Sequence, residues 1–280
     1  MRTAFHILSI VIISESLAGD VTRLKQQLEN LNSLALDYVE AHKDSLENVT
    51  ANGLLEQLSR RESYSWSGYS SCPERSGIFD INVPNEPKFE AMCDAEIAGP
   101  GWLVIMRRYD GSVNFYRNWT QYKNGFGELS GEFFIGLDRL HAITASQEHE
   151  LYIHVEDFDG NSRYARFDDF VISSEHQFYE IQRLGSYTGD VGDVMSYHRN
   201  GKFSTFDKKN ENSTSTYTEI HMGAWWYQEG AASNLFGLYM SGPVDAEWRH
   251  KSMSLYTWRG WSYSLRVAQM MVKPKCTCVT

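Results

Sequence analysis

The stretch from Gly99 to Thr144, GPGWLVIMRRYDGSVNFYRNWTQYKNGFGELSGEFFIGLDRLHAIT, shows the character of most of the chain. A glycine recurs every few residues, and large aromatic rings lie between the glycines. This texture indicates a loop-rich fold that uses aromatic side chains as packing anchors. Near its end, Phe134, Leu137 and Leu140 follow a near-helical spacing, which predicts a short helix packed on a sheet.

Four segments further along show the apolar pattern of strands. In the first of them, Leu151, Ile153 and Val155 share one face, which predicts a half-buried strand. The four segments are LYIHVEDF (151–158), YARFDDFVI (164–172), FYEIQRL (178–184) and SYSLRVAQMMV (262–272). Residues 187–261 have weak periodicity and many Gly, Ser, Asn and Tyr residues, so we expect an irregular lobe built from loops.

The bulk composition is that of an ordinary folded protein, with 42% apolar and 22% charged residues in 280. The formal net charge of −10 argues against nucleic acid and anionic membranes as partners. The sequence contains no H-E-x-x-H, no G-x-S-x-G and no glycine loop that would cradle a phosphate. These observations point away from an enzyme and from nucleic-acid binding.

Residues 1–18 have the pattern of a secretory signal peptide. The positive charge of Arg2 precedes the apolar run AFHILSIVII, and small residues lead to Ala18, where cleavage is expected. No later run is long enough to span a bilayer as a helix. The mature protein is therefore predicted to be secreted and extracellular. Three N-x-[ST] sequons fit a glycoprotein, namely Asn48, Asn118 and Asn212.

Residues 19–61 are predicted to form a helical, coiled-coil stalk that makes the protein a homo-oligomer. An apolar seam with alternating steps of four and three residues runs through this segment; it comprises Leu24, Leu28, Leu31, Ala35 and Tyr38. The seam is short, so a helix that lies on the domain or frays in solvent is the alternative. Small and polar side chains then mark residues 62–71 as a linker.

The four cysteines form two pairs of different character. Cys72 and Cys93 are 21 positions apart, and a disulfide is the default in an oxidising compartment. Cys276 and Cys278 lie in the tail 276–280, where a bond to each other would close a strained, very small ring. Bonds to another chain are one alternative for this second pair, and a disordered tail with capped thiols is the other.

Many spaced signatures along residues 68–275 together resemble the fibrinogen C-terminal globular domain. In the order expected, they are CPERSGIFDINVP, FEAMCD, the 99–144 stretch, EDFDGNSRYARF, YHRNGKFSTFD, GAWWY, SNLFGLYMSGP and WRGWSYSLRVAQMMVKP. The chain is similar to invertebrate fibrinogen-related proteins of the ficolin and tachylectin type, and to angiopoietin-like domains. We assign this domain to residues 72–275.

The resemblance implies an α+β fold in three parts. They are a small N-terminal piece held by a Cys72–Cys93 disulfide, a central antiparallel sheet whose last strand comes from residues 261–273, and a loop-rich recognition lobe over residues 187–261. The EDFDGN segment resembles the start of an EF-hand loop, but it lacks the glycine and the distal glutamate of that loop and is expected to be a structural turn. Members of the family are not enzymes, and they bind acetylated sugars, peptide ends or receptors.

Related proteins hold calcium in a loop that corresponds to FSTFDKKNENST (203–214). Counted from the shared FST, the three acidic positions are occupied here by Asp207, Lys209 and Glu211. Calcium takes about six to eight oxygen ligands, so a lysine ammonium both removes a ligand and repels the ion. We therefore expect a degenerate calcium loop without metal, in which Lys209 pairs with Asp207 or Glu211, and no cofactor.

Relatives also have a second disulfide around the WW pair, and its cysteines align with Tyr217 and Gly230. In relatives the peptide bond before the far cysteine is cis and helps to shape the ligand pocket. Because a non-proline cis bond costs about 3 kcal/mol and the cross-link is missing here, we expect a trans Glu229–Gly230 bond and a more mobile loop.

Gap-free counting places six residues at or near the pocket that relatives use: His221, Trp225, Tyr227, Ala231, Arg249 and Trp261. An aromatic wall with a His or Arg donor suits an N-acetyl group. For the Trp225–Trp226 pair, anchoring of the core is the alternative role.

These residues predict a secreted, non-catalytic lectin that binds N-acetylated glycans in innate immune pattern recognition. An oligomer would strengthen weak binding at each site through multivalency. The alternative is an extracellular protein-interaction or signalling ligand that binds a receptor or matrix protein through the same lobe.

Overall fold

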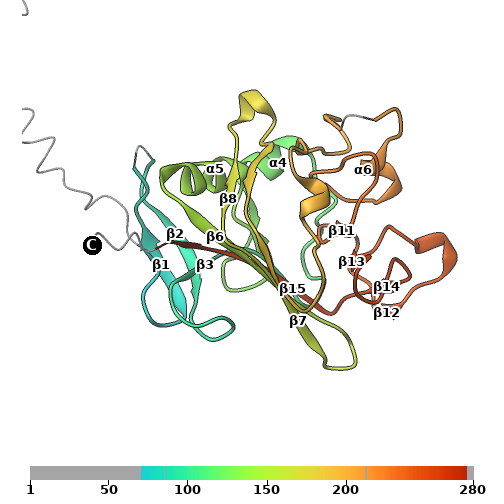
Figure 1. The fold of residues 1–280 in the computed structure, drawn as a ribbon, viewed down its shortest axis with the longest axis horizontal. Helices are drawn as coiled ribbons and strands as arrows, with labels where there is room; N and C mark the ends of the chain where they lie inside the picture. Colours follow the sequence, from blue (N-terminus) through green and yellow to red (C-terminus); the bar gives the residue numbers. More distant parts are fainter. Residues whose placement is uncertain (1–70, 85, 212, 276–280) are drawn as a thin grey trace, which may run out of the picture. The chain divides into compact units, whose positions relative to one another are not determined.

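A computed structural model describes residues 71–84, 86–211 and 213–275 of the chain (Figure 1). The predicted signal peptide (1–18), the stalk (19–61), nearly all of the linker (62–71) and the tail (276–280) lie outside these residues, as do Asn48 and Asn212. Within the described ranges, no helix is long and apolar enough to cross a membrane.

A nine-stranded antiparallel sheet forms the centre of the domain (Figure 1). Along its main path the strands are β1 (Gly77–Ile81), β2 (Phe89–Asp94), β3 (Trp102–Arg108), β15 (Val267–Pro274), β6 (His149–Glu156), β7 (Ser162–Phe167) and β10 (Tyr187–Gly189). Two short strands, β4 (Phe126–Gly127) and β5 (Phe133–Phe134), extend it beside β3. The predicted return of the chain into the sheet is confirmed, since β15 pairs with both β3 and β6.

One face of this sheet is covered by the helices α4 (Trp119–Asn124) and α5 (Leu137–Ser146) (Figure 1). Leu151, Ile153 and Val155 of β6 are fully buried, as their alternation predicts. The expected helix is present as α5, but Phe134 lies in β5 instead. Gly136 separates the two elements with φ +102°, and a Cβ there would lie 2.8 Å from the carbonyl carbon of Asn124. That turn therefore requires glycine.

The N-terminal piece is held by the predicted disulfide between Cys72 and Cys93, with the two Cα atoms 5.6 Å apart. Both cysteines are buried, and Cys93 lies in β2 opposite Leu103 of β3. Closing this loop stabilises the domain by roughly 3 kcal/mol on the chain-entropy estimate. The bond thus fixes the start of the domain to β2, the second strand of the central sheet.

Three of the predicted strands differ from the structure, and the one over 262–272 divides into β14 (Tyr263–Ser264) and β15. The 164–172 segment divides into β7 and β8 (Phe170–Ile172), and β8 pairs with β9 (Ile181–Leu184) in a separate two-stranded sheet. The strand expected over 178–184 begins only at β9, because Phe178 and Tyr179 have positive φ angles of 57° and 49°. The EDFDGN segment is the turn between β6 and β7, as predicted.

The lobe over residues 187–261 is irregular, as predicted (orange to red in Figure 1). Its regular elements are short. Besides β10, and together with the neighbouring β14, they are η2 (Ser196–His198), α6 (Tyr217–Ile220), β11 (Ser233–Asn234), β12 (Gly242–Pro243), η3 (Ala246–Trp248), β13 (Ser254–Leu255) and β14 (Tyr263–Ser264). A further 3-10 turn, η1 (Glu175–Gln177), precedes the lobe. Because these loops contain little regular secondary structure, their core consists largely of buried aromatic rings. Trp225, Trp226 and Tyr227 are three of them, and each is fully buried.

Candidate recognition surface

His221 lies at the end of α6 with its ring between other rings. Its Nδ1 lies 2.8 Å from the carbonyl oxygen of His250, so this nitrogen carries the proton and donates. The ring stacks on Tyr227, with centroids 5.1 Å apart and an interplanar angle of 11°. Burial lowers the pKa of His221 to about 4, so the imidazole is neutral at pH 7 and its Nε2 carries a lone pair.

From His221 a row of rings leads to the surface. The centroid of Trp261 lies 5.6 Å from that of His221 and 5.0 Å from that of His250. Tyr256 lies 6.2 Å from Trp261 and is 66% exposed, the most exposed large apolar side chain in the described residues. We call His221, His250, Tyr256 and Trp261 the aromatic patch. Sequence reasoning missed His250 and Tyr256, although aromatic and basic residues alternate around both.

The other predicted pocket residues lie in different surroundings. Trp225 and Tyr227 have no exposed surface, and the Tyr227 hydroxyl donates to Oδ1 of Asn234 at 2.8 Å. Ala231 is half-buried against the core, and Arg249 is exposed beside His250. The structure therefore brings His221, Tyr227 and Trp261 together, while the ring of Trp225 packs on Trp226. Their contact with a ligand stays a prediction, and a direct contact with Trp225 would need the core to open.

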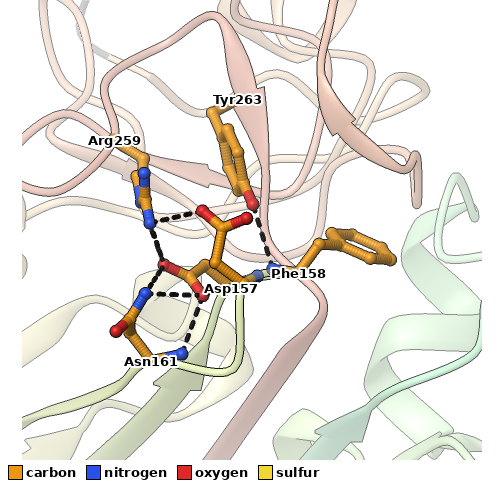
Figure 2. A network of polar contacts seen from close by, with 6 residues as sticks. Asp157, Phe158, Asn161, Arg259 and Tyr263 are labelled. Carbon is orange, nitrogen blue, oxygen red and sulfur yellow. Dashed lines mark hydrogen bonds and ion pairs between the residues drawn. The ribbon is translucent and has the colours of Figure 1, made fainter.

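An ion-pair network fixes the segment that carries Tyr256 and Trp261 (Figure 2). The guanidinium of Arg259 donates from Nε to Oδ2 of Asp157 at 3.0 Å and from Nη2 to Asp159 at 2.7 Å. The backbone of Arg259 has a positive φ of 64°. Burial raises the pKa of Asp157, but hydrogen bonds from Asn161 and Arg259 outweigh it and hold this pKa at about 2. The β6–β7 turn of the central sheet is thereby tied to the tip of the lobe.

The place of the missing second disulfide is taken by non-covalent contacts. Tyr217 stacks near His221, with centroids 6.0 Å apart. The Glu229–Gly230 peptide bond is trans, as predicted, and the Tyr197 hydroxyl donates to the Glu229 carbonyl at 2.8 Å. The predicted mobility of this loop stays a prediction.

His198 supports the same loop from beneath, and sequence reasoning missed it. This fully buried ring lies with Nδ1 2.9 Å from the Trp226 carbonyl and with Nε2 3.2 Å from the backbone N of Ala232 and 3.3 Å from that of Ser233. Both nitrogens are therefore used by one neutral tautomer, with Nδ1 as donor and Nε2 as acceptor. Burial lowers the pKa of His198 to about 4.

The predicted degenerate calcium loop fits a calcium site only in part, since both carboxylate oxygens of Glu211 are buried without a hydrogen-bond partner in the described residues, whereas the other two positions offer little. Asp207 Oδ1 already accepts from the backbone N of Trp119 at 2.9 Å and from Oγ1 of Thr205 at 2.7 Å. Lys209 pairs with Glu219 at 2.8 Å, so the expected pairing with Asp207 or Glu211 is wrong. Glu219 belongs to α6, whose position beside the loop the local sequence does not reveal. Across the described part of the chain, no group of three or more His, Cys, Asp or Glu residues could hold a metal ion.

Of the three sequons, only Asn118 lies in the described residues. It is half-buried at the N-cap of α4, where its side chain accepts from the backbone N of Gln121 at 3.0 Å. Its backbone N in turn donates to the Gln121 side chain, which completes a capping box. Glycosylation at Asn118 stays a prediction.

Residues 67–275 match the family described as "Fibrinogen beta and gamma chains, C-terminal globular domain". Human fibrinogen-like protein 1 is 34% identical over 90% of this chain and 84% of its own length. Bovine angiopoietin-related protein 7 is 39% identical over 71% of this chain, but the match spans only 58% of that protein. Among solved structures, the fibrinogen-like globe domain of human ANGPTL6 has a TM-score of 0.69 at 36% identity, covering 72% of this chain and 90% of that one.

Proposed function

Because the chain belongs to the family of fibrinogen C-terminal globular domains, whose members are not enzymes, we propose that it is an extracellular ligand that binds another protein through its recognition lobe. The single observation that carries this proposal is the aromatic patch, in which Tyr256, 66% exposed, adjoins the buried ring of Trp261. Relatives named as fibrinogen-like and angiopoietin-related proteins support an extracellular protein-interaction role over the lectin role expected first.

The composition of the patch suits a protein partner. Tyrosine, tryptophan and arginine dominate the energetics of protein interfaces, and the exposed Arg249 adjoins the rings. The rings are held in place by the Asp157–Arg259 ion pair and by the His221–His250 hydrogen bond. A preformed surface of this kind loses little side-chain entropy on binding.

A second candidate function is recognition of N-acetylated glycans, the lectin role in innate immunity. It is supported by the tautomer of His221, whose Nε2 is left as an acceptor for an N–H donor such as the amide of an acetamido group. The neighbouring ring of Trp261 would pack against the acetyl methyl group. Secretion through residues 1–18 and oligomerisation through residues 19–61 belong to either function, and the Cys72–Cys93 disulfide fits an oxidising compartment.

The two functions separate in one experiment on the full-length secreted chain. It would be tested against a panel of purified receptor ectodomains and against a glycan array, each with and without a calcium chelator. We expect saturable binding to one ectodomain, weakened ~10-fold or more by Tyr256→Ala. Tyr109→Ala, at another exposed tyrosine outside the patch, is the matched control and should bind normally. Binding only to acetylated glycans, with elution by free N-acetylglucosamine, would replace the first function by the second.

A further inference from the structure

A pocket of about 420 Å³ opens at another place, between the loop that follows β3 and the 238–240 segment. Most of its wall is apolar, with Val113, Phe115, Met240 and Trp248 among the lining residues. Its charged lining residue is Arg108, the last residue of β3, and no carboxylate lines the pocket. The pocket shares no residue with the aromatic patch.

Arg108 is unusual because a cation is almost completely buried, with 1% of its surface exposed. Both of its carbonyl acceptors, Leu235 at 3.0 Å and Gly237, are bound by the same nitrogen, Nη1. Its Nε is buried without an acceptor, and Nη2 donates no hydrogen bond to the described residues. The guanidinium carbon lies 4.2 Å from the centroid of the Phe115 ring, which supports the charge from one face.

Glu132, the carboxylate whose charge acts on Arg108, forms no ion pair with it. Glu132 is buried and accepts hydrogen bonds from four backbone N–H groups of the loop after β3, those of Tyr109, Asp110, Gly111 and Val113. No ion pair joins Glu132 to Arg108 within the described ranges, since the carboxylate is fully occupied in shaping the loop. Arg108 thus keeps the Nε–Nη2 edge of its guanidinium, the edge at which arginine holds a carboxylate with two parallel hydrogen bonds.

We propose that this pocket binds a carboxylate attached to a flat apolar group, as at the C-terminus of a peptide that ends in an aromatic residue. The two carboxylate oxygens accept from Nε and Nη2 of Arg108, and the ring packs against Met240 and Trp248. The positive charge selects the ionised acid, and the apolar wall selects a hydrophobic neighbour. This site is independent of whether the aromatic patch binds a protein or a glycan.

The test uses N-acetyl-L-phenylalanine and its amide, two ligands that differ only in the charged group. On the full-length protein at pH 7, calorimetric titration should give a Kd on the order of 1 mM for the acid, a value expected for a ligand of this size. The amide should bind ~10-fold or more weakly, because it cannot form the charge-assisted pair. Equal affinities of the acid and the amide would refute the proposal.

Variants locate the binding. Trp248→Ala removes a wall of the pocket and should weaken the acid ~10-fold, whereas Trp258→Ala, at a half-buried tryptophan outside the pocket, should leave the affinity unchanged. Arg108→Lys keeps the charge but loses the fork and should abolish the preference for acid over amide; if it does not fold, Trp248→Ala still decides. N-acetylneuraminic acid, a carboxylate on a polar sugar, should not bind, and tighter binding of this acid than of N-acetyl-L-phenylalanine would overturn the role of the apolar wall.

Discussion

Acidification is expected to weaken the tip of the lobe through His198. This ring is fully buried, and its Nε2 accepts from the backbone N–H groups of Ala232 and Ser233. A proton on Nε2 would place an N–H against two other N–H groups and would leave the Ser233 hydroxyl, 3.2 Å away, as its nearby oxygen. Burial disfavours the charged imidazolium, and protonation also removes the acceptor of two backbone N–H groups, so the pKa of His198 is low.

The magnitude follows from the two pKa values. A histidine with an ordinary pKa of about 6.5 in the unfolded chain and about 4 in the folded protein contributes ~3 kcal/mol, at about 1.4 kcal/mol for each pH unit. Because the folded-state pKa is the lower one, this stability is complete above pH 6.5 and is lost as the pH falls towards 4. Burial also lowers the pKa values of His149 and His221 to about 4, so the three losses occur in the same window.

Urea unfolding at pH 7, 6 and 5 would measure this effect, with His198→Gln as the test variant. Glutamine cannot titrate, so the free energy of unfolding should fall less steeply in the variant than in the wild type as the pH is lowered. The difference between the two slopes should be about 1.4 kcal/mol for each pH unit below 6.5. At pH 7 the variant should be less stable by ~1–3 kcal/mol, because it repeats the imidazole hydrogen bonds imperfectly. His176→Gln, at an exposed histidine, is the control. Equal slopes for the wild type and His198→Gln would refute the reasoning.

Three further predictions concern the other supports of the domain. Arg259→Ala should lower the urea midpoint, because the buried carboxylate of Asp157 loses its cation and keeps only its hydrogen bonds from Asp159 and Asn161; an unchanged midpoint would contradict this. Calcium and a chelator should both leave the thermal unfolding temperature unchanged, because Lys209 occupies the loop with its ion pair to Glu219, and a rise with added calcium would show a working site. If Cys276 and Cys278 join chains, the double variant Cys276→Ser/Cys278→Ser should migrate as a monomer on a non-reducing gel where the wild type does not; identical migration would exclude such bonds.

Local patterns predicted the elements whose structure depends on nearby residues. The alternation of Leu151, Ile153 and Val155 identified β6, and the apolar spacing through Leu137 and Leu140 identified α5. The error at Phe134 has a local cause too, since only the positive φ of Gly136 ends the strand before the helix begins. The sequence signatures were enough for the family, because they are many and lie in order.

The site was harder to predict because its geometry depends on contacts between distant segments. His221 was expected in the pocket from its alignment, but its neutral tautomer follows from the carbonyl of His250, 29 positions away. Lys209 was expected to neutralise its own loop, yet α6 presents Glu219 to it. The burial of Trp225 and Tyr227 likewise reflects how the loops close over them, which the order of residues in GAWWY does not show.

The tip of the lobe keeps its shape here by a different chemistry from the one that the family resemblance implies. A disulfide responds to redox conditions and a bound calcium ion responds to chelators, but Tyr217 and Gly230 cannot form a disulfide, and Lys209 takes one of the acidic positions of the calcium loop of relatives. The present supports are the buried hydrogen bonds of His198 and the ion pairs of Arg259 and Lys209. Protonation of His198 removes the acceptor at Nε2, and the exposed Lys209–Glu219 ion pair is screened by salt. The order of the recognition surface should therefore depend on pH and ionic strength, and not on calcium or reductant acting at the tip.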